Sequence, residues 1–388
     1  MKSDVVRCAR NKRASVLTAL LATFVASGCA EATSPAWRTE CVGYYTMQIP
    51  GDIEYAVQQQ PLERGWLPKF STGLGVFKTS FSVGLDSEGT DLGDIEISSE
   101  ATQQELDALA KARNNELQKF KNDRLSMADG IDDRPVQQKR LRKEAAEVQF
   151  YAPFNGGSVS ARYGETGVSV DALVGDRIVS TGLKLTGTPQ QTIDAFLKRY
   201  RARAPFDVPT EPGVCFPYSF VTGEKEPASV GISMRLRDRP DIVIYLHDGK
   251  DFTRLEPPKS AKAYLSKAVQ GFFYGAKLAN PLDGDLMPFR AITIDEREGQ
   301  GGFALVTRDS DPGPEAINNA VNKDQDWAYL AYVPADKAAP PGMSSDLVFK
   351  VERFGRFAKQ PMTEKEFREL VKTLAAGIRR RPGAWVPR

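Results

Sequence analysis

The stretches Cys41-Val42-Gly43-Tyr44-Tyr45 and Cys215-Phe216-Pro217-Tyr218-Ser219 are similar, and they lie 215 − 41 = 174 residues apart. Each starts with a cysteine and continues with residues that include β-branched or aromatic side chains, which are typical of strands. We therefore expect each stretch to open the first strand of one half of the chain, with the two halves built alike.

Two predicted helices repeat at a similar offset, one from Thr188 and one from Thr363. In each, the threonine is followed three residues later by Gln191 or Glu366, which is the pattern of a capping box. Apolar residues then recur at helical spacing, and a tail of arginine and proline follows. The inward-facing residues are Ile193, Phe196, Leu197 and Tyr200, then Phe367, Leu370, Val371 and Leu374; the tails are Arg201-Ala202-Arg203-Ala204-Pro205 and Arg379-Arg380-Arg381-Pro382.

Earlier in each half, a strand signal precedes another predicted helix. The first helix runs from Thr102 to about Leu125, capped by Thr102 and Glu105, and the second runs from Ser260 to about Phe273. Short β-rich runs follow each helix. The inward residues of the first helix are Leu106, Leu109, Leu117 and Phe120; the strand signals are Asp94–Ile97, Val148–Tyr151, Val168–Ala172, Asp241–Leu246, Phe303–Val306, Trp327–Val333 and Leu347–Val351.

These patterns predict an α+β protein with two similar α+β domains, each with an antiparallel sheet and two helices. A diverged internal duplication would explain the repeated pattern. Chance similarity of two α+β domains is the alternative, because the spacing drifts in the middle of each half. The expected boundaries are 38–205 for the N-terminal domain and 214–388 for the C-terminal domain. A linker at 206–213 joins them, and its prolines make it stiff and extended.

The first 28 residues have the pattern of a signal peptide. Basic residues precede an apolar run from Ala14 to Val25, which is the order found in exported precursors. Ser27 and Gly28 stand directly before Cys29, and this arrangement resembles a bacterial lipoprotein box, in which the cysteine is acylated and becomes the new N-terminus. An ordinary signal peptide cut near Ala30 is the alternative.

This interpretation predicts a lipid-attachment site at Cys29, a lipidated tether over residues 29–37 and a periplasmic location. Ala30, rather than aspartate, after the acylated cysteine favours the periplasmic face of the outer membrane. No second apolar run reaches the roughly 18 residues that a spanning helix needs.

Removal of the signal peptide changes the charge. The full chain has 52 Lys and Arg and 50 Asp and Glu. The signal peptide takes five basic residues and one acid, which leaves 52 − 5 = 47 against 50 − 1 = 49, a formal charge of −2. No block of like charge remains beyond Arg379-Arg380-Arg381, so a nucleic-acid partner is not supported.

The same cleavage leaves two cysteines for the folded protein. Cys8 leaves with the signal peptide and Cys29 carries lipid, so Cys41 and Cys215 remain. Two thiols in an oxidising compartment suggest one disulfide, worth roughly 5 kcal/mol in the chain-entropy model. Two buried free thiols are the alternative.

Residues for catalysis are scarce. The single histidine, His247, precedes a turn signal at Asp248-Gly249, and we expect it in a surface turn; no Gly-x-Ser-x-Gly elbow accompanies it. One histidine and a cysteine pair cannot supply a zinc site. Asp283-Gly284-Asp285 lacks the rest of a calcium loop, and Gly73–Thr79 lacks the glycine that precedes lysine in a phosphate loop. The prediction is therefore no catalytic residue, no cofactor, no metal and no enzyme activity.

The segments Glu40-Cys41-Val42-Gly43-Tyr44-Tyr45, Cys215-Phe216 and Pro240–Ile244 resemble the domain starts of one lipoprotein family. That family comprises the immunity proteins that neutralise lipase effectors of type VI secretion systems. The resemblance extends from about residue 37 to the C-terminus, although Tyr44 stands where the family has arginine. It implies a two-domain protein that grips a cognate phospholipase and keeps its lid from opening.

The resemblance implies a secreted lipase or phospholipase effector as the protein partner, with the membrane contacted through the N-terminal lipid. It assigns no effector-binding residue. A non-catalytic envelope assembly or scaffold lipoprotein is the main alternative, and a hydrolase with dispersed carboxylates is a third. Aromatic residues are candidate contacts by type, although each also suits a core: Trp66, Phe272, Phe273, Tyr274 and Trp385.

Overall fold

The structure is a computed structural model that describes residues 36–57, 81–83, 92–131, 133–164, 167–223, 229–249, 276–281, 289–308, 326–336 and 345–384. Several predicted features lie outside these residues. They are the signal peptide with Cys29, the helix expected over Ser260–Phe273, the loops at Gly73–Thr79 and Asp283–Asp285, and the candidate contacts Trp66, Phe272, Phe273, Tyr274 and Trp385.

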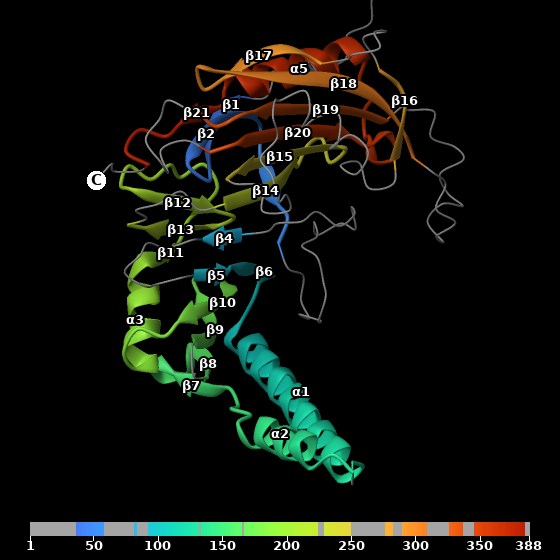
Figure 1. Ribbon diagram of the computed structural model, residues 1–388. Coiled ribbons are helices and arrows are strands. Elements are labelled where there is room, and N and C mark those ends of the chain that lie inside the picture. The colour runs from blue at the N-terminus through green and yellow to red at the C-terminus, as the bar shows by residue number, and fades with distance from the viewer. Residues whose placement is uncertain are drawn as a thin grey trace, which may run out of the picture. The chain divides into compact units, whose positions relative to one another are not determined.

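Strands from both halves of the chain form one antiparallel sheet (Figure 1). Within the described ranges it has 15 strands in the order β16-β18-β19-β20-β15-β14-β4-β5-β10-β9-β8-β7, with β17 paired to β18, β3 to β14 and β6 to β10. Their bounds are β3 Ile53–Tyr55, β4 Phe81–Val83, β5 Leu92–Asp94, β6 Glu96–Glu100, β7 Ala152–Phe154, β8 Val159–Tyr163, β9 Gly167–Val174, β10 Arg177–Lys184, β14 Ser229–Leu236, β15 Ile242–Asp248, β16 Ala276–Pro281, β17 Arg290–Ile294, β18 Arg297–Arg308, β19 Asp326–Val333 and β20 Leu347–Arg353.

Two small sheets complete the strand pairing that the structure describes. One joins β1 (Trp37–Val42), β2 (Tyr45–Pro50) and β21 (Arg379–Arg380), and the other joins β11 (Tyr200–Ala202), β13 (Ser219–Thr222) and β12 (Gly213–Phe216). The helices are α1 Gln103–Asp129, α2 Pro135–Ala146, α3 Pro189–Arg199 and α5 Glu364–Ala376, with 3₁₀ turns at η1 Asn155–Gly157 and η3 Gly355–Phe357. The α+β class predicted from the sequence is confirmed.

Strand pairing crosses the predicted domain boundary. Strand β14 follows the linker in sequence, yet it pairs with β3 and β4, which precede the linker. Strand β2 likewise pairs with β21, which is close to the C-terminus. The boundaries at 205 and 214, and the internal duplication, stay predictions.

The helix starts agree with the sequence. Thr102 with Glu105, Thr188 with Gln191, and Thr363 with Glu366 all form complete capping boxes, in which side chain and backbone bond reciprocally. Helices α3 and α5 bury the predicted apolar stripe, including Ile193, Phe196, Phe367, Val371 and Leu374. None of the described helices is long and apolar enough to cross a membrane.

Helix α1 differs from the prediction at Phe120, whose side chain is 41% exposed rather than inward. Leu106 and Leu109 are buried at the start of α1, whereas the later turns of the helix pack on α2 instead of the sheet. The Arg124 guanidinium carbon lies 4.8 Å from the centroid of the Phe120 ring and covers it. Apolar spacing identified the helix correctly but not the point at which it leaves the sheet.

The segment predicted as a strand at Val148–Tyr151 is not one. The Tyr151 amide donates to the Asn114 side chain at 2.7 Å, and the Asn114 amide group donates back to the Tyr151 carbonyl at 3.0 Å. This α1 side chain takes the bonds that a neighbouring strand would otherwise take. Helix α2, which precedes the segment, was not predicted because Arg134 at its start makes no side-chain cap, although Pro135 stands at its first turn.

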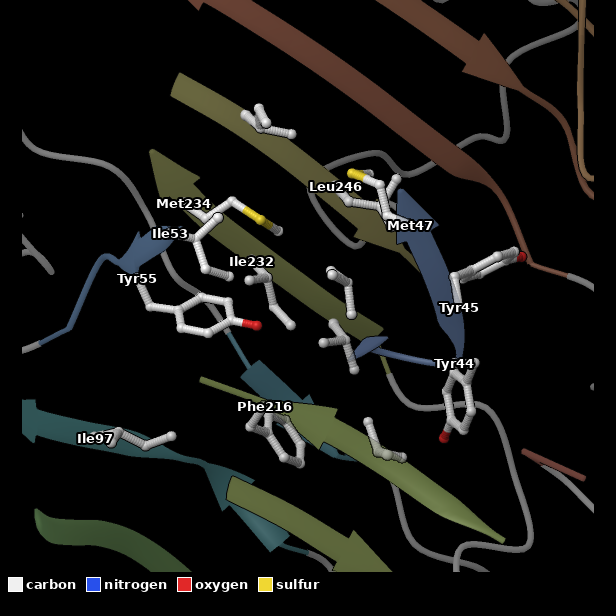
Figure 2. Close-up of a cluster of buried hydrophobic side chains, with 14 of the residues drawn as sticks. Tyr44, Tyr45, Met47, Ile53, Tyr55, Ile97, Phe216, Ile232, Met234 and Leu246 are labelled. Carbon is white, nitrogen blue, oxygen red and sulfur yellow. The ribbon is translucent and has the colours of Figure 1, made fainter. Parts of the chain in front are cut away.

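The main core brings apolar side chains of both halves together (Figure 2). Tyr44, Tyr45, Met47, Ile53 and Tyr55 come from the N-terminal segment and are all at most 3% exposed. The same cluster contains Phe216, Ile232, Met234 and Leu246 from strands after the linker. The N-terminal hairpin is therefore part of the same apolar interior as the strands that follow the linker.

Candidate functional site at the junction of two hairpins

The cysteine of each repeated stretch is the last but one residue of the first strand of a β-hairpin. Cys41 lies in β1 opposite Thr46 of β2, and Cys215 lies in β12 opposite Phe220 of β13. The sequence predicts that each cysteine opens its strand. The strands instead begin four and two residues earlier, at Trp37 and Gly213.

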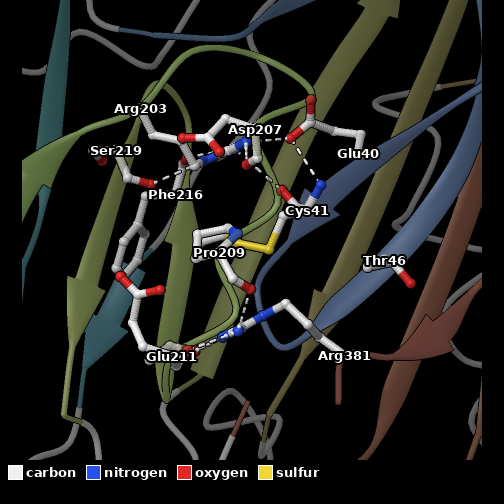
Figure 3. Close-up of a disulfide and its surroundings, with 12 residues drawn as sticks. Glu40, Cys41, Thr46, Arg203, Asp207, Pro209, Glu211, Phe216, Ser219 and Arg381 are labelled. Carbon is white, nitrogen blue, oxygen red and sulfur yellow. Dashed lines mark hydrogen bonds and ion pairs between the residues drawn. A yellow bond between two sulfur atoms is a disulfide. The ribbon is translucent and has the colours of Figure 1, made fainter. Parts of the chain in front are cut away.

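A disulfide joins these two equivalent positions (Figure 3). The Cα atoms of Cys41 and Cys215 are 5.8 Å apart, and neither residue is exposed. Gly43 and Cys215 also exchange two backbone hydrogen bonds of 3.0 Å each. Gly43 has a φ of +60°, a conformation that glycine adopts without steric cost. The covalent bond and the backbone bridge together fix one hairpin against the other.

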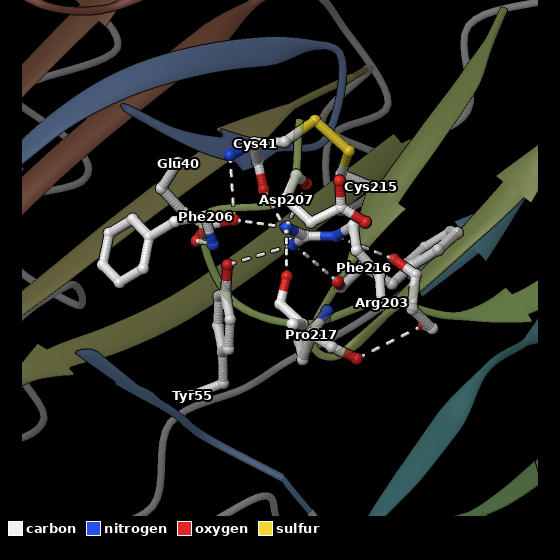
Figure 4. Close-up of polar contacts among 11 residues, drawn as sticks. Glu40, Cys41, Tyr55, Arg203, Phe206, Asp207, Cys215, Phe216 and Pro217 are labelled. Atoms are coloured by element: carbon white, nitrogen blue, oxygen red, sulfur yellow. Dashed lines mark hydrogen bonds and ion pairs between the residues drawn. A yellow bond between two sulfur atoms is a disulfide. The ribbon is translucent and has the colours of Figure 1, made fainter. Parts of the chain in front are cut away.

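A buried ion pair lies beside the disulfide (Figure 4). The Nη1 of Arg203 is 2.7 Å from Oε1 of Glu40, and the two side chains are 1% and 0% exposed. Arg203 directly follows β11, and Glu40 directly precedes Cys41. The Glu40 carboxylate also accepts the backbone N–H groups of Cys41 and Phe206. Such a pair offsets its desolvation only when further hydrogen bonds satisfy both ions, and here they do.

The Arg203 guanidinium connects the two cysteine-bearing strands through their backbones. It donates to the carbonyl oxygens of Cys41 at 3.2 Å and Phe216 at 3.3 Å. It also donates to the Tyr55 hydroxyl at 3.3 Å and to the Asp207 carbonyl in the linker at 2.9 Å. Burial acts to lower the pKa of Arg203, but the neighbouring Tyr55 and Glu40 raise it overall. The guanidinium is therefore a permanent cation at the centre of the junction.

A second buried arginine holds the other end of the linker. Arg381 is 2% exposed, and its guanidinium donates to the carbonyl oxygens of Pro209 and Glu211 at 2.8 Å and of Gly213 at 2.6 Å. Its backbone N–H donates to the Tyr44 carbonyl at 2.9 Å. The segment predicted as a stiff linker is therefore fixed by Arg203 at its start and by Arg381 at its end.

The structure brings Cys41 and Cys215 together, whereas Cys29 lies outside the described residues. Tyr44 stands where the family that the sequence resembles has arginine. It is 3% exposed and belongs to the core. Sequence reasoning missed Glu40, Arg203 and Arg381 as junction residues. The signal was present in the two arginine-proline tails, because Arg203 and Arg381 each come from one of them.

His247 is not in a surface turn, contrary to the prediction. It lies inside β15, opposite Gly231 of β14 and Val348 of β20, and is half-buried with its ring 6.4 Å from that of Tyr245. The turn signal at Asp248-Gly249 correctly marked the end of the strand, one residue later. Among the described residues, no group of three or more His, Cys, Asp or Glu side chains is placed to hold a metal ion.

A buried carboxylate lies at the end of β15. Asp248 is 2% exposed and accepts a hydrogen bond from the Ser345 hydroxyl. The nearby Arg297 donates to the Ser345 carbonyl at 2.7 Å and to the Tyr45 hydroxyl at 2.9 Å. Burial raises the pKa of Asp248 to about 6, against the lowering effects of Ser345, Arg380 and Arg297.

This raised pKa predicts a pH-dependent stability. Because the folded state keeps the Asp248 proton up to about pH 6, unfolding releases it between about pH 4 and 6, and stability falls as the pH rises through that window. The shift corresponds to roughly 3 kcal/mol. We expect the stability of Asp248→Asn, relative to that of the wild type, to be higher at pH 7.5 than at pH 4. Urea unfolding of both proteins at the two pH values measures this difference. The exposed substitution Asp52→Asn is the control, and a wild-type-to-variant difference that does not change with pH would contradict the prediction.

Comparison with known proteins finds likeness in solved structures alone. No protein-family model matches the chain, and no curated protein matches it. A structure of the immunity protein TplEi of the type VI secretion system from Pseudomonas aeruginosa, complexed with "L" peptide, is 15% identical, with a TM-score of 0.45 over 89% of this chain and 98% of that chain.

The chain is similar to an immunity protein. The apo structure of TplEi is 13% identical, with a TM-score of 0.43 over 89% of this chain and 97% of TplEi. A chain of the Tle4–Tli4 complex is 14% identical, with a TM-score of 0.45 over 89% of this chain and 98% of that chain.

Proposed function

We propose that this protein is a periplasmic immunity lipoprotein that binds and inhibits a cognate phospholipase or lipase effector of a type VI secretion system. It protects the membranes of the cell that produces it. Inhibition is by binding, so the protein is not itself an enzyme and needs no cofactor. Its body is tethered to the periplasmic face of the outer membrane through lipid on Cys29.

The observation that carries this proposal is the junction. The two stretches that carry the family resemblance, around Cys41 and around Cys215, lie against each other and are joined by a disulfide. The resemblance therefore falls on residues that determine how the halves are joined, rather than on unrelated strands. A binder that grips a partner with both halves needs such a fixed junction, because binding loses affinity when surfaces must be ordered first.

The proposal predicts rescue from toxicity. The cognate lipase effector is directed to the periplasm, and survival is counted with and without co-export of this protein. We expect survival to return to the level of cells without lipase, and the two proteins to co-purify at a fixed ratio. His247→Ala is the matched control for hidden catalysis, because an inhibitor that acts by binding keeps its protection without the single histidine.

Two further variants separate location from binding. Removal of residues 1–28 leaves the protein in the cytoplasm, where it is expected to give no protection. Cys29→Ala is expected to move the protein from the membrane fraction to the soluble periplasmic fraction while it still binds the lipase. Failure of the full-length protein both to rescue and to co-purify would reject the immunity function and favour an envelope scaffold.

A further inference from the structure

A groove of about 530 Å³ lies between α5 and the strands β17, β18 and β19. Its floor is formed by the largely apolar side chains of Phe303, Tyr329 and Val371, which are 9%, 5% and 1% exposed. The cations Arg290, Arg368 and Lys372 also line it. No aspartate or glutamate is among the described residues that line it. Small-molecule sites commonly have about this volume, an apolar lining and a few convergent polar groups.

The polar group of the floor is the Tyr329 hydroxyl. Among the described residues it has no hydrogen-bond partner, although the side chain is almost fully buried. Burial raises the pKa of the phenol, so the hydroxyl keeps its proton and remains a donor. A Cβ atom at Gly301 would lie 2.3 Å from this oxygen. Glycine at position 301 therefore leaves the space that the hydroxyl occupies.

The cations converge on the same place. Arg290 of β17 pairs directly with Gly301 of β18, and directly paired residues of antiparallel strands project to the same face. Arg290 therefore projects from the face on which the Tyr329 hydroxyl lies. From α5, the Arg368 guanidinium carbon lies 4.5 Å from the centroid of the Phe303 ring.

Arg368 and Lys372 pair with glutamates of α5. Arg368 pairs with Glu364 at 2.8 Å and Lys372 with Glu369 at 3.1 Å. Both glutamates are about half exposed or more, and an exposed pair such as Lys372 with Glu369 contributes little to stability. An anionic ligand can therefore compete for these cations.

We propose that this groove binds a long-chain carboxylate of the fatty-acid class. The alkyl chain covers Phe303, Tyr329 and Val371, and the carboxylate accepts from the Tyr329 hydroxyl and pairs with Arg290. An acidic peptide side chain would supply the carboxylate but is too short to cover the floor. A neutral lipid would cover the floor but would not be attracted by the positive charges of the groove. This activity goes beyond inhibition of an effector and does not depend on it.

The test is calorimetric titration of the purified protein with dodecanoate in detergent-free buffer, below the concentration at which micelles form. We expect one site per chain and at least tenfold weaker binding of dodecanol. Shortening the ligand to decanoate is expected to weaken binding by up to about fourfold for each methylene removed. Tyr329→Phe and Arg290→Gln are each expected to weaken dodecanoate binding about tenfold or more, because each removes a partner of a charged acceptor.

Lys139→Gln on α2 is the matched control, since it also removes one surface cation and is expected to leave dodecanoate binding unchanged. Circular dichroism checks that each variant keeps the wild-type fold. The proposal is overturned by absent binding, by equal binding of dodecanol, or by binding that neither groove variant changes. Displacement of dodecanoate by an equal concentration of a Glu- and Leu-rich peptide would also overturn it, and would assign the groove to a protein partner.

Discussion

Replacing Arg203 with leucine is expected to lower the free energy of unfolding by about 3–5 kcal/mol. The reason is the Glu40 carboxylate, which is fully buried and would lose its only counter-ion in the described structure. The substitution also removes the guanidinium bonds to the Cys41 and Phe216 carbonyls, which link the two hairpins. Urea unfolding at neutral pH measures the loss.

Arg201→Leu is the matched control two residues away. Arg201 is 48% exposed and pairs with Glu211 on the surface, so its loss is expected to cost at most about 1 kcal/mol. The double variant Glu40→Gln with Arg203→Leu removes both charges and is expected to recover part of the stability that Arg203→Leu loses. If Arg203→Leu unfolds within about 1 kcal/mol of the wild type, the ion pair does not hold the junction.

Replacing both cysteines with alanine is expected to cost about 2–5 kcal/mol. The bond between Cys41 and Cys215 closes a loop with a sequence separation of 174 residues, so its loss frees a long unfolded chain. Unfolding of the double variant is compared with the wild type in the presence and absence of reductant. Reductant is expected to lower the stability of the wild type to that of the variant and to leave the variant unchanged.

Non-reducing mass analysis provides the independent check on this bond. The mature wild-type protein is expected to take up no alkylating reagent at Cys41 or Cys215 after unfolding without reductant. Two alkylated thiols would show that the pair is free in the protein, and the expected stability difference would then have to come from packing alone. Either result is read on the same sample that is used for unfolding.

Predictions that use only neighbouring residues in the sequence were the most reliable. The three capping boxes and the strand signals at Val168, Trp327 and Leu347 depend on residues close together in the chain, and the structure contains each of these elements. The predictions for Phe120 and Tyr151 failed for a different reason. Their outcome depends on more distant contacts. Arg124, which covers Phe120, pairs with Glu144 of α2, and the Asn114 side chain bonds to Tyr151.

The junction shows the same limit. The two cysteines were identified because their surroundings repeat, and a cysteine pair in an oxidising compartment is expected to form a disulfide. Glu40 and Arg203 are 163 residues apart, and nothing in either local pattern marks them as buried, since charged residues are usually exposed. The linker was expected to be a stiff connector from its prolines, but its fixation by Arg381 depends on a residue near the other end of the chain.

The place of β21 has a consequence for how the chain folds. The sheet that begins at Trp37 receives its third strand from Arg379 and Arg380. The carbonyl groups of the linker accept hydrogen bonds from Arg381. A ribosome synthesises Arg379 a further 379 − 37 = 342 residues after Trp37. The sheet of the N-terminal hairpin therefore remains incomplete until Arg379 and Arg380 have been synthesised, and pairing over such a distance in the chain is slow. Chains that stop before Arg379 lack β21 and therefore cannot complete this sheet.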